Sequence, residues 1–215
     1  MRLDSYLVEF GNVSSRSRAK HAIVQGQIKV NAKVITRPSF DVVYSDKIEL
    51  TEGLDKPAGY WKLKQIQETT NLIEKGDTVL DIGSSAGGFL LFASELASSV
   101  HGIEFSHEFR YELEKIVHER PNVTIEFNDV FTRASGNEKY DVLLLDITVD
   151  PFDSLKALKN VLAALKKGGM LLQVFKLPEK SDSGAIIEEL SLMGFEIIQI
   201  MGAQKKEEYV IARKL

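Results

Sequence analysis

The chain has 215 residues, of which 44% are hydrophobic, and its formal net charge is −4. This length exceeds that of most single domains, so we expect one ordinary domain and a small additional one. The chain has no cysteine, which excludes disulfides, thiolate metal sites and a cysteine nucleophile. The four histidines lack ligand spacing, so we expect no bound metal. No apolar run approaches the ~18 residues of a membrane span, and the first residues lack a signal peptide's apolar stretch. We therefore expect a cytoplasmic protein without membrane contact.

The charges are distributed unevenly along the chain. Residues 1–38 carry seven basic and two acidic side chains, a net charge of +5, which leaves −9 for the remainder. Such segregation is typical of a polyanion-binding module attached to an acidic domain.

Residues 1–50 are expected to form a compact α+β module. Ser14 or Ser15 is the predicted N-cap of its second helix. The predicted elements are a short amphipathic helix from Leu3 to about residues 11–12, a helix over 16–24, strands over 27–31 and 34–35, and a strand pair within 41–50.

Three motifs occur together in this module: Arg-Leu-Asp-x-x-Leu, Ser-Arg-Ser-Arg-Ala-Lys and Gly-x-Ile-x-Val-Asn. This combination resembles the S-four RNA-binding domain, the αL module shared by a small-subunit ribosomal protein, pseudouridine synthases and tyrosyl-tRNA synthetases. The resemblance implies that the second helix and the following strand turn lie along an RNA backbone, where Arg and Lys contact phosphates. In an isolated helix, the same basic residues could equally form a solvent-exposed face that binds nothing. The residues implied for RNA binding are Arg2, Arg16, Arg18, Lys20, Lys29, Asn31 and Lys33.

A linker is expected over residues 51–59 and a larger domain over 60–215. In this domain, predicted strands alternate with predicted helices, which indicates a parallel sheet with right-handed crossovers. Only a short polar loop joins the last two strands, so the last should run antiparallel. The expected strands are 78–82, 100–104, 123–128, 140–147, 169–176, 195–201 and 207–213; the expected helices are around 61–73 and over 89–96, 107–117, 152–165 and 184–193.

The first of these strands ends in a glycine-rich turn with the spacing Asp-x-Gly-x-x-x-Gly-Gly, and a helix follows. Glycines let the backbone approach a ligand, and the N–H groups of the new helix face it. The spacing differs from both common phosphate-binding patterns, and no lysine follows. A carboxylate at Asp81 favours a cationic or hydroxyl-bearing ligand over a phosphate. Taken alone, the loop could hold a dinucleotide or a nucleoside, or it could be only a tight turn.

Four acidic residues follow or end successive predicted strands: Asp81, Glu104, Asp129 and Asp146. Ligands of open α/β sheets bind at this carboxyl edge. Glu104, about twenty residues after the glycine turn, suits ribose hydroxyls, and Asp129 could accept from an adenine amino group. Any one of them alone would suit a helix cap or the surface, but four at one edge favour a ligand site.

The arrangement resembles class I S-adenosylmethionine-dependent methyltransferases, and its glycine turn resembles that of FtsJ/RrmJ-type ribose methyltransferases. Together with the S-four module it resembles the TlyA family, also labelled hemolysin A-like. The resemblance implies a Rossmann-like seven-stranded sheet with strand order 3-2-1-4-5-7-6 and S-adenosylmethionine as cofactor. The residues implied for the cofactor are Asp81, Gly83, Ser84, Ser85, Gly87, Gly88, Phe89, Glu104, Asp129, Val130 and Asp146.

FtsJ-type enzymes use a Lys-Asp-Lys-Glu set to methylate a ribose 2′-hydroxyl. The matching residues here are Lys62, Asp146, Lys176 and Glu207, although Gln173 occupies an alternative register for the second lysine. A ribose hydroxyl is a poor nucleophile, so a lysine amine must accept or orient its proton. We assign Lys176 as the expected base, with Lys62, Asp146 and Glu207 as orienting partners.

The resemblance therefore predicts a methyltransferase acting on a ribose 2′-hydroxyl of RNA, with ribosomal RNA or a ribosomal subunit as the partner. An arginine that usually precedes the first lysine is missing, because Pro57-Ala58-Gly59 stands there. This departure favours an alternative, an RNA-binding protein with a degenerate, non-catalytic methyltransferase fold. The sequence gives no support to a pore-forming hemolysin.

Overall fold

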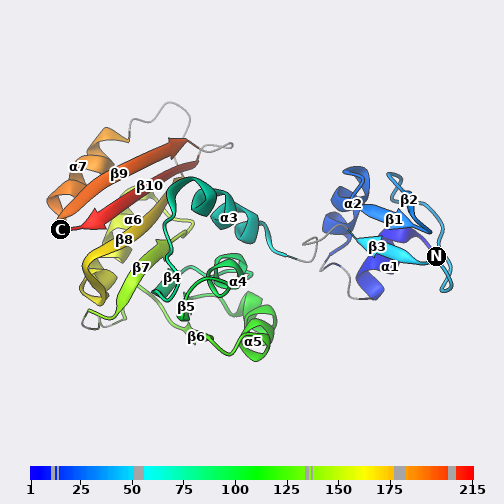
Figure 1. Ribbon diagram of the computed structural model, residues 1–215, viewed down its shortest axis with the longest axis horizontal. Helices are drawn as coiled ribbons and strands as arrows, with labels where there is room; N and C mark the ends of the chain where they lie inside the picture. Colours follow the sequence, from blue (N-terminus) through cyan, green and yellow to red (C-terminus); the bar gives the residue numbers. More distant parts are fainter. Residues whose placement is uncertain are drawn as a thin grey trace. The chain divides into compact units, whose positions relative to one another are not determined.

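The computed structural model describes residues 1–10, 13, 15–50, 56–133, 136, 138–176, 183–202 and 207–215. The chain divides into two compact units, Met1–Lys56 and Pro57–Leu215 (Figure 1). Residues 51–55 of the expected linker lie outside the described residues, as do residues 11–12 and Ser14. Ala58 and Gly59, which the predicted linker includes, lie in the first turn of a helix.

The first unit packs two helices against a three-stranded antiparallel sheet of order β2-β1-β3. Ser15 accepts a hydrogen bond from the Arg18 backbone N–H at 3.3 Å, which confirms a serine N-cap on the second helix. The core of this first unit contains Leu3, Ile23 and Ile28. The elements are α1 (Leu3–Glu9), α2 (Arg16–Val24), β1 (Ile28–Val30), β2 (Lys33–Val34) and β3 (Ile48–Leu50).

The strand pair expected within residues 41–50 is wrong, because β3 is the one strand that the structure places there. Asp41 makes an isolated bridge to Arg2. The intervening chain turns instead, since the Asp46 carboxylate accepts from the Val43 N–H at 2.9 Å, and the Asp46 N–H donates back to the Val43 carbonyl at 3.0 Å. A side chain that bonds its own turn competes with a strand ladder.

The second unit contains a seven-stranded sheet of order β6-β5-β4-β7-β8-β10-β9 (Figure 1). The strand order 3-2-1-4-5-7-6 is thereby confirmed, and β10 runs antiparallel to both of its neighbours. The strands are β4 (Thr78–Ile82), β5 (Ser99–Glu104), β6 (Val123–Phe127), β7 (Tyr140–Leu145), β8 (Leu165–Lys176), β9 (Phe195–Gly202) and β10 (Glu207–Lys214).

Helices cover both faces of this sheet. One core cluster joins the sheet to α3, α4 and α5, and a second joins it to α6 and α7. The helix expected over 152–165 ends earlier, at Val161, and a 3-10 turn over Leu162–Ala164 leads directly into β8. The helices are α3 (Ala58–Thr70), α4 (Gly88–Ala93), α5 (Arg110–Glu119), α6 (Pro151–Val161) and α7 (Gly184–Leu192), with a further 3-10 turn over His107–Phe109.

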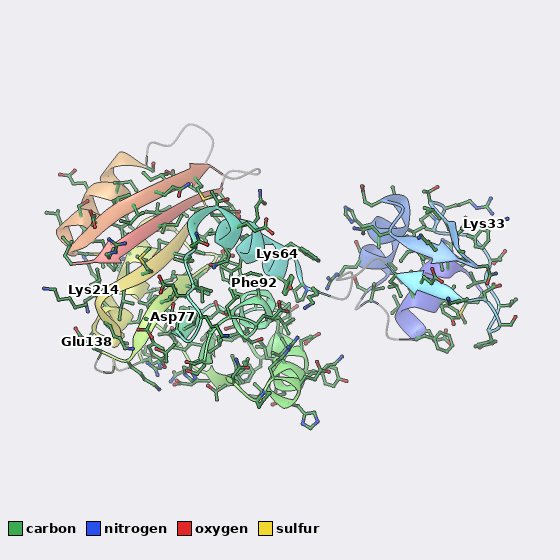
Figure 2. The ribbon with its side chains drawn as sticks, viewed as in Figure 1. Lys33, Lys64, Asp77, Phe92, Glu138 and Lys214 are labelled. Atoms are coloured by element: carbon green, nitrogen blue, oxygen red, sulfur yellow. The ribbon has the colours of Figure 1, made fainter. Side chains whose placement is uncertain are left out.

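The first turns of α3 and α4 approach closely at two glycines. A Cβ on Gly88 would lie 2.6 Å from the Tyr60 backbone nitrogen and 2.7 Å from the Gly59 Cα. The aromatic rings of Tyr60 and Phe92 pack edge-on across the same contact, with their centroids 5.3 Å apart; Figure 2 labels Phe92. Any side chain at residue 88 therefore moves α3.

We predict that Gly88→Ala destabilises this unit by about 1–3 kcal/mol, the usual cost of overpacking a close contact. Urea unfolding followed by fluorescence measures this, because Trp61 is the chain's one tryptophan and lies on α3. Gly202→Ala is the matched control, since a Cβ there meets nothing within 4 Å. Equal midpoints for the two variants would contradict the prediction.

Candidate active site

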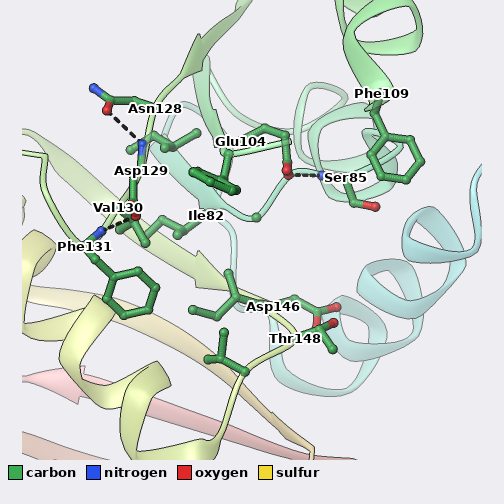
Figure 3. Close-up of a pocket in the computed structure, with 15 residues that line it drawn as sticks. Ile82, Ser85, Glu104, Phe109, Asn128, Asp129, Val130, Phe131, Asp146 and Thr148 are labelled. Carbon is green, nitrogen blue, oxygen red and sulfur yellow. Dashed lines mark hydrogen bonds between the residues drawn. The ribbon is translucent and has the colours of Figure 1, made fainter. Parts of the chain in front are cut away.

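A cavity of about 400 Å³ opens at the carboxyl ends of the central parallel strands (Figure 3). This volume lies in the range of small-molecule sites, and this edge is where open α/β sheets bind ligands. Its lining residues are Ile82, Gly83, Ser85, Ile103, Glu104, Phe105, Phe109, Asn128, Asp129, Val130, Phe131, Asp146, Ile147, Thr148 and Val149.

The glycine turn forms one wall of this cavity. Gly83 has φ +80°, and a Cβ there would lie 2.6 Å from Ile147 and 3.0 Å from the Asp146 carbonyl oxygen. Ser85 also has a positive φ, of 47°. The left-handed backbone and the close approach together explain why glycine stands at residue 83.

The Glu104 side chain ties the turn to the next strand. One of its carboxylate oxygens accepts from the Ser85 N–H and the other from the Ser106 N–H, each at 2.7 Å (Figure 3 shows the Ser85 bond). The carboxylate is therefore held at the cavity wall by charge-assisted hydrogen bonds.

Asp81 lies beneath the turn, with only 1% of its surface exposed, and does not belong to the cavity lining. Burial raises the pKa of Asp81 to about 7, and the nearby Asp146 and Glu104 carboxylates act in the same direction. Its Oδ2 and the Asp146 Oδ1 have no hydrogen-bond partner within the described part of the chain. Two such oxygens near one cavity favour a ligand that brings positive charge or N–H groups.

The predicted cofactor residues separate into two groups. Gly83, Ser85, Glu104, Asp129, Val130 and Asp146 line the cavity. Ser84 and Phe89 are buried, Gly87 is the left-handed N-cap of α4, and Gly88 contacts α3. These four shape the turn, and their contact with a ligand stays a prediction.

Sequence reasoning missed several lining residues, notably the aromatic Phe105, Phe109 and Phe131 and the polar Asn128 and Thr148. Phe105, Asn128 and Thr148 come within three residues of a strand end, so their position in the chain was an available signal. Asp129 accepts a hydrogen bond from the Phe131 N–H at 2.9 Å, which folds that loop onto the cavity (Figure 3).

Four charged side chains, from α3, β8, β10 and the segment that follows β7, meet beside the cavity. The Lys62 ammonium on α3 lies 2.8 Å from Asp146 Oδ2 and 3.0 Å from Glu207 Oε2. Lys176, the last residue of β8, places its Nζ 3.9 Å from the other Asp146 oxygen. The structure thus brings the predicted set Lys62, Asp146, Lys176 and Glu207 together, while their roles in catalysis stay a prediction.

The surroundings of Lys62 favour its charged form. Burial lowers the pKa of Lys62, but the Asp146 and Glu207 carboxylates outweigh burial, and the net shift is upward. The Tyr209 hydroxyl donates to Glu207 Oε2 at 3.1 Å, and burial raises the pKa of Tyr209 to about 12. Lys62 is therefore a fixed cation at neutral pH, held by two carboxylates.

A family model for FtsJ-like methyltransferases matches residues 58–215, more than half of the chain. The chain belongs to the FtsJ-like methyltransferases. A second model, for the S4 domain, matches residues 1–48, so this FtsJ-like methyltransferase carries an N-terminal S4 domain. The strand order of the seven-stranded sheet is that of the class I methyltransferase fold.

Individual relatives agree with the family. Ribosomal RNA large subunit methyltransferase E of Methanosarcina acetivorans is 28% identical over 139 residues, 58% of this chain and 50% of that protein. Hemolysin A of Brachyspira hyodysenteriae is 30% identical over 110 residues, 50% of this chain and 45% of that protein. The chain thus spans about half the length of these two relatives. Aeropyrum pernix fibrillarin, solved with natively bound S-adenosyl-L-methionine, shares the fold with a TM-score of 0.59 at 21% identity, over 72% of this chain and 75% of that one.

In the S4 domain, a buried acid holds two of the predicted RNA-binding residues. Asp4 is inaccessible and accepts from Arg2 at 2.9 and 3.0 Å and from Arg16 at 3.1 Å. The Arg2 hydrogen bonds, with those of Arg16, hold the pKa of Asp4 at about 2 despite its burial. Arg2 and Arg16 therefore stabilise the domain itself, and their contact with RNA stays a prediction.

The remaining predicted RNA-binding residues differ in their surroundings. Lys20, Lys29 and Lys33 are exposed. Arg18 donates to the Lys56 carbonyl oxygen at 2.5 Å. Asn31 bonds Asp46 and the Lys47 N–H, at 2.8 and 2.9 Å, from the hairpin turn between β1 and β2. Asn31 thus has a structural role in addition to any contact with RNA.

No helix within the described ranges has the length and apolar character needed to cross a membrane. Within the same ranges, no group of three or more potential ligand side chains could hold a metal ion.

Asp81 predicts a specific pH dependence of the methyltransferase unit's stability. Its folded pKa of about 7 lies above the ordinary 3.8, so the folded state retains a proton that the unfolded state loses. The free energy of unfolding should therefore fall as pH rises from about 4 to about 7, and remain lower above that range.

Asp81→Asn removes this titration. Urea unfolding at pH 5 and pH 8 should show the variant gaining stability relative to the wild type at the higher pH. Glu68→Gln, at an exposed position of α3, is the control. A constant difference between Asp81→Asn and wild type at both pH values would contradict the predicted shift.

Proposed function

We propose that the protein transfers a methyl group from S-adenosylmethionine to a ribose 2′-hydroxyl of RNA, with ribosomal RNA as the substrate class. The observation that carries the proposal is the cluster of Lys62, Asp146, Lys176 and Glu207 beside a ligand-sized cavity. The names of several relatives, which refer to ribosomal RNA large subunit methyltransferases, support the substrate class. Such a substrate is consistent with a cytoplasmic location.

The residues around the cavity fit this cofactor. Glu104 and Asp129 offer carboxylates to ribose hydroxyls and to an amino group, and Val130 and Phe131 offer apolar surface to an aromatic base. Within the described residues, Asp81 Oδ2 and Asp146 Oδ1 accept no hydrogen bond, which favours a positively charged group nearby. When bound, S-adenosylmethionine supplies a methyl group made electrophilic by its attachment to a sulfonium sulfur.

The lysine cluster would handle the proton of the attacking hydroxyl. Lys176 contacts Thr148 of the cavity lining and its side chain is one-third exposed, so an incoming ribose could reach its amine. In this proposal that amine accepts the hydroxyl proton, while the Lys62 ammonium orients the oxygen. Asp146 and Glu207 hold Lys62 in place, so orientation is provided before the substrate arrives.

A second candidate is RNA binding without methyl transfer. It is favoured by Pro57-Ala58-Gly59, where an arginine is missing from the pattern before the first lysine. In both cases residues 1–50 would dock the RNA, and a linker would join them to the methyltransferase domain.

We predict that the wild type transfers tritiated methyl from S-adenosylmethionine to total RNA or unmodified ribosomal subunits. After alkaline hydrolysis, the label should be recovered in 2′-O-methylated dinucleotides, because the methyl group blocks cleavage of the adjacent phosphodiester bond. Lys176→Ala should reduce the rate about 10²- to 10⁴-fold, the usual contribution of a general base. Lys167→Ala, near the other end of β8, should not. Label on a base would contradict ribose methylation. Absence of label, together with intact RNA binding, would favour the second candidate.

If the S4 domain contacts RNA phosphates, the affinity for RNA should depend on salt concentration through its exposed lysines. Neutralising Lys29 and Lys33 together, as glutamines, should weaken RNA binding and lower the slope of log affinity against log salt by about 1 to 2. Filter binding at several salt concentrations measures this slope. The double variant Lys75→Gln/Lys167→Gln is the matched control. It removes the same charge from the opposite edge of the seven-stranded sheet to the cavity, where β4 and β8 begin. Equal slopes in both double variants would contradict a docking role for the S4 domain.

A further inference from the structure

Thr148 lines the cavity, three residues beyond the end of β7. Its hydroxyl accepts a hydrogen bond from the Lys176 ammonium, which also faces Asp146 Oδ1 at 3.9 Å. Figure 3 shows Thr148 and Asp146 on the same wall of the cavity. Among the described residues, the lysine therefore has one neutral partner in contact and one charged partner farther away.

The backbone just before Thr148 is held by the end of β4 and by the glycine turn. The Asp146 N–H donates to the Ile82 carbonyl at 3.3 Å, and Ile147 packs so closely over Gly83 that a Cβ there would clash. Side chains on such a supported segment hold their partners with little loss of freedom. The Thr148 hydroxyl is thus placed by the same contacts that shape the glycine turn.

We propose that Thr148 is a positioning residue that holds the Lys176 amine toward the substrate hydroxyl. This inference rests on the proposed function. A hydroxyl oxygen can accept an N–H from either the ammonium or the neutral amine, so the contact survives the loss of a proton and leaves the amine lone pair free. A carboxylate in the same place would favour the ammonium, as Asp146 and Glu207 do for Lys62.

The two lysines are therefore differentiated by their partners. Lys62 lies within 3.0 Å of two carboxylates, whereas Lys176 contacts a neutral hydroxyl. Thr148 gives direction to Lys176 without adding negative charge. From this difference we infer that Lys62 stays a fixed cation and that Lys176 accepts the proton.

The test compares Thr148→Val, Thr148→Ser and wild type in steady-state transfer of tritiated methyl to RNA. Valine keeps the shape and removes the hydroxyl, so kcat should fall about tenfold, the value of one hydrogen bond to a charged group. KM for RNA and Kd for S-adenosylmethionine should stay within about twofold. Serine should restore kcat to within about threefold of wild type. Thr69→Val, at an exposed position of α3, is the control for a threonine-to-valine change.

A Thr148→Val kcat within twofold of wild type would overturn the proposal. So would a loss explained by weaker cofactor binding, or a Thr148→Ser variant as slow as Thr148→Val. These outcomes are distinct from failure of the proposed function, which wild-type label on a base, or no wild-type transfer, would reveal.

Discussion

The carboxylate of Asp146 is the constraint on which the site depends. One of its oxygens binds the Lys62 ammonium at 2.8 Å, and the other faces Lys176 at 3.9 Å, while the residue itself lines the cavity. A single side chain therefore links the ligand cavity to both lysines. Its position follows from the parallel pairing of β4 and β7, which brings the end of β7 beside the glycine turn.

The glycine turn is held by Glu104, an acid that also lines the cavity. Glu104 holds the Ser85 and Ser106 N–H groups, and Asp81 lies buried beneath the turn without a partner for Oδ2 within the described residues. An unpartnered buried oxygen is costly to the folded state, so its presence favours a role in binding. The site thus combines a rigid backbone with carboxylates whose hydrogen-bonding capacity is only partly used.

Much of this could be predicted from the sequence, because strand and helix periods were clear where strands are buried on both faces. Thr78–Ile82 and Arg16–Val24 have the bounds that the pattern predicted. The sequence left the position of the second lysine of the set ambiguous. Gln173 proves to be fully buried and bonded to Ser154 at 2.6 Å, whereas Lys176 is partly exposed and lies 3.9 Å from Asp146. The false strand pair near Asp46, by contrast, came from alternation that a local side-chain hydrogen bond overrides. Contacts such as Thr148 with Lys176 join residues 28 apart, and no local pattern encodes them.

The most direct test is the single-turnover rate of methyl transfer by Asp146→Asn at saturating S-adenosylmethionine and RNA. Saturation removes any loss of cofactor affinity from the comparison, so the rate reports the positioning of the lysines alone. The account predicts a fall of at least about 100-fold in a variant that remains folded and binds both ligands. A rate within about threefold of wild type would contradict the claim that this carboxylate organises the site.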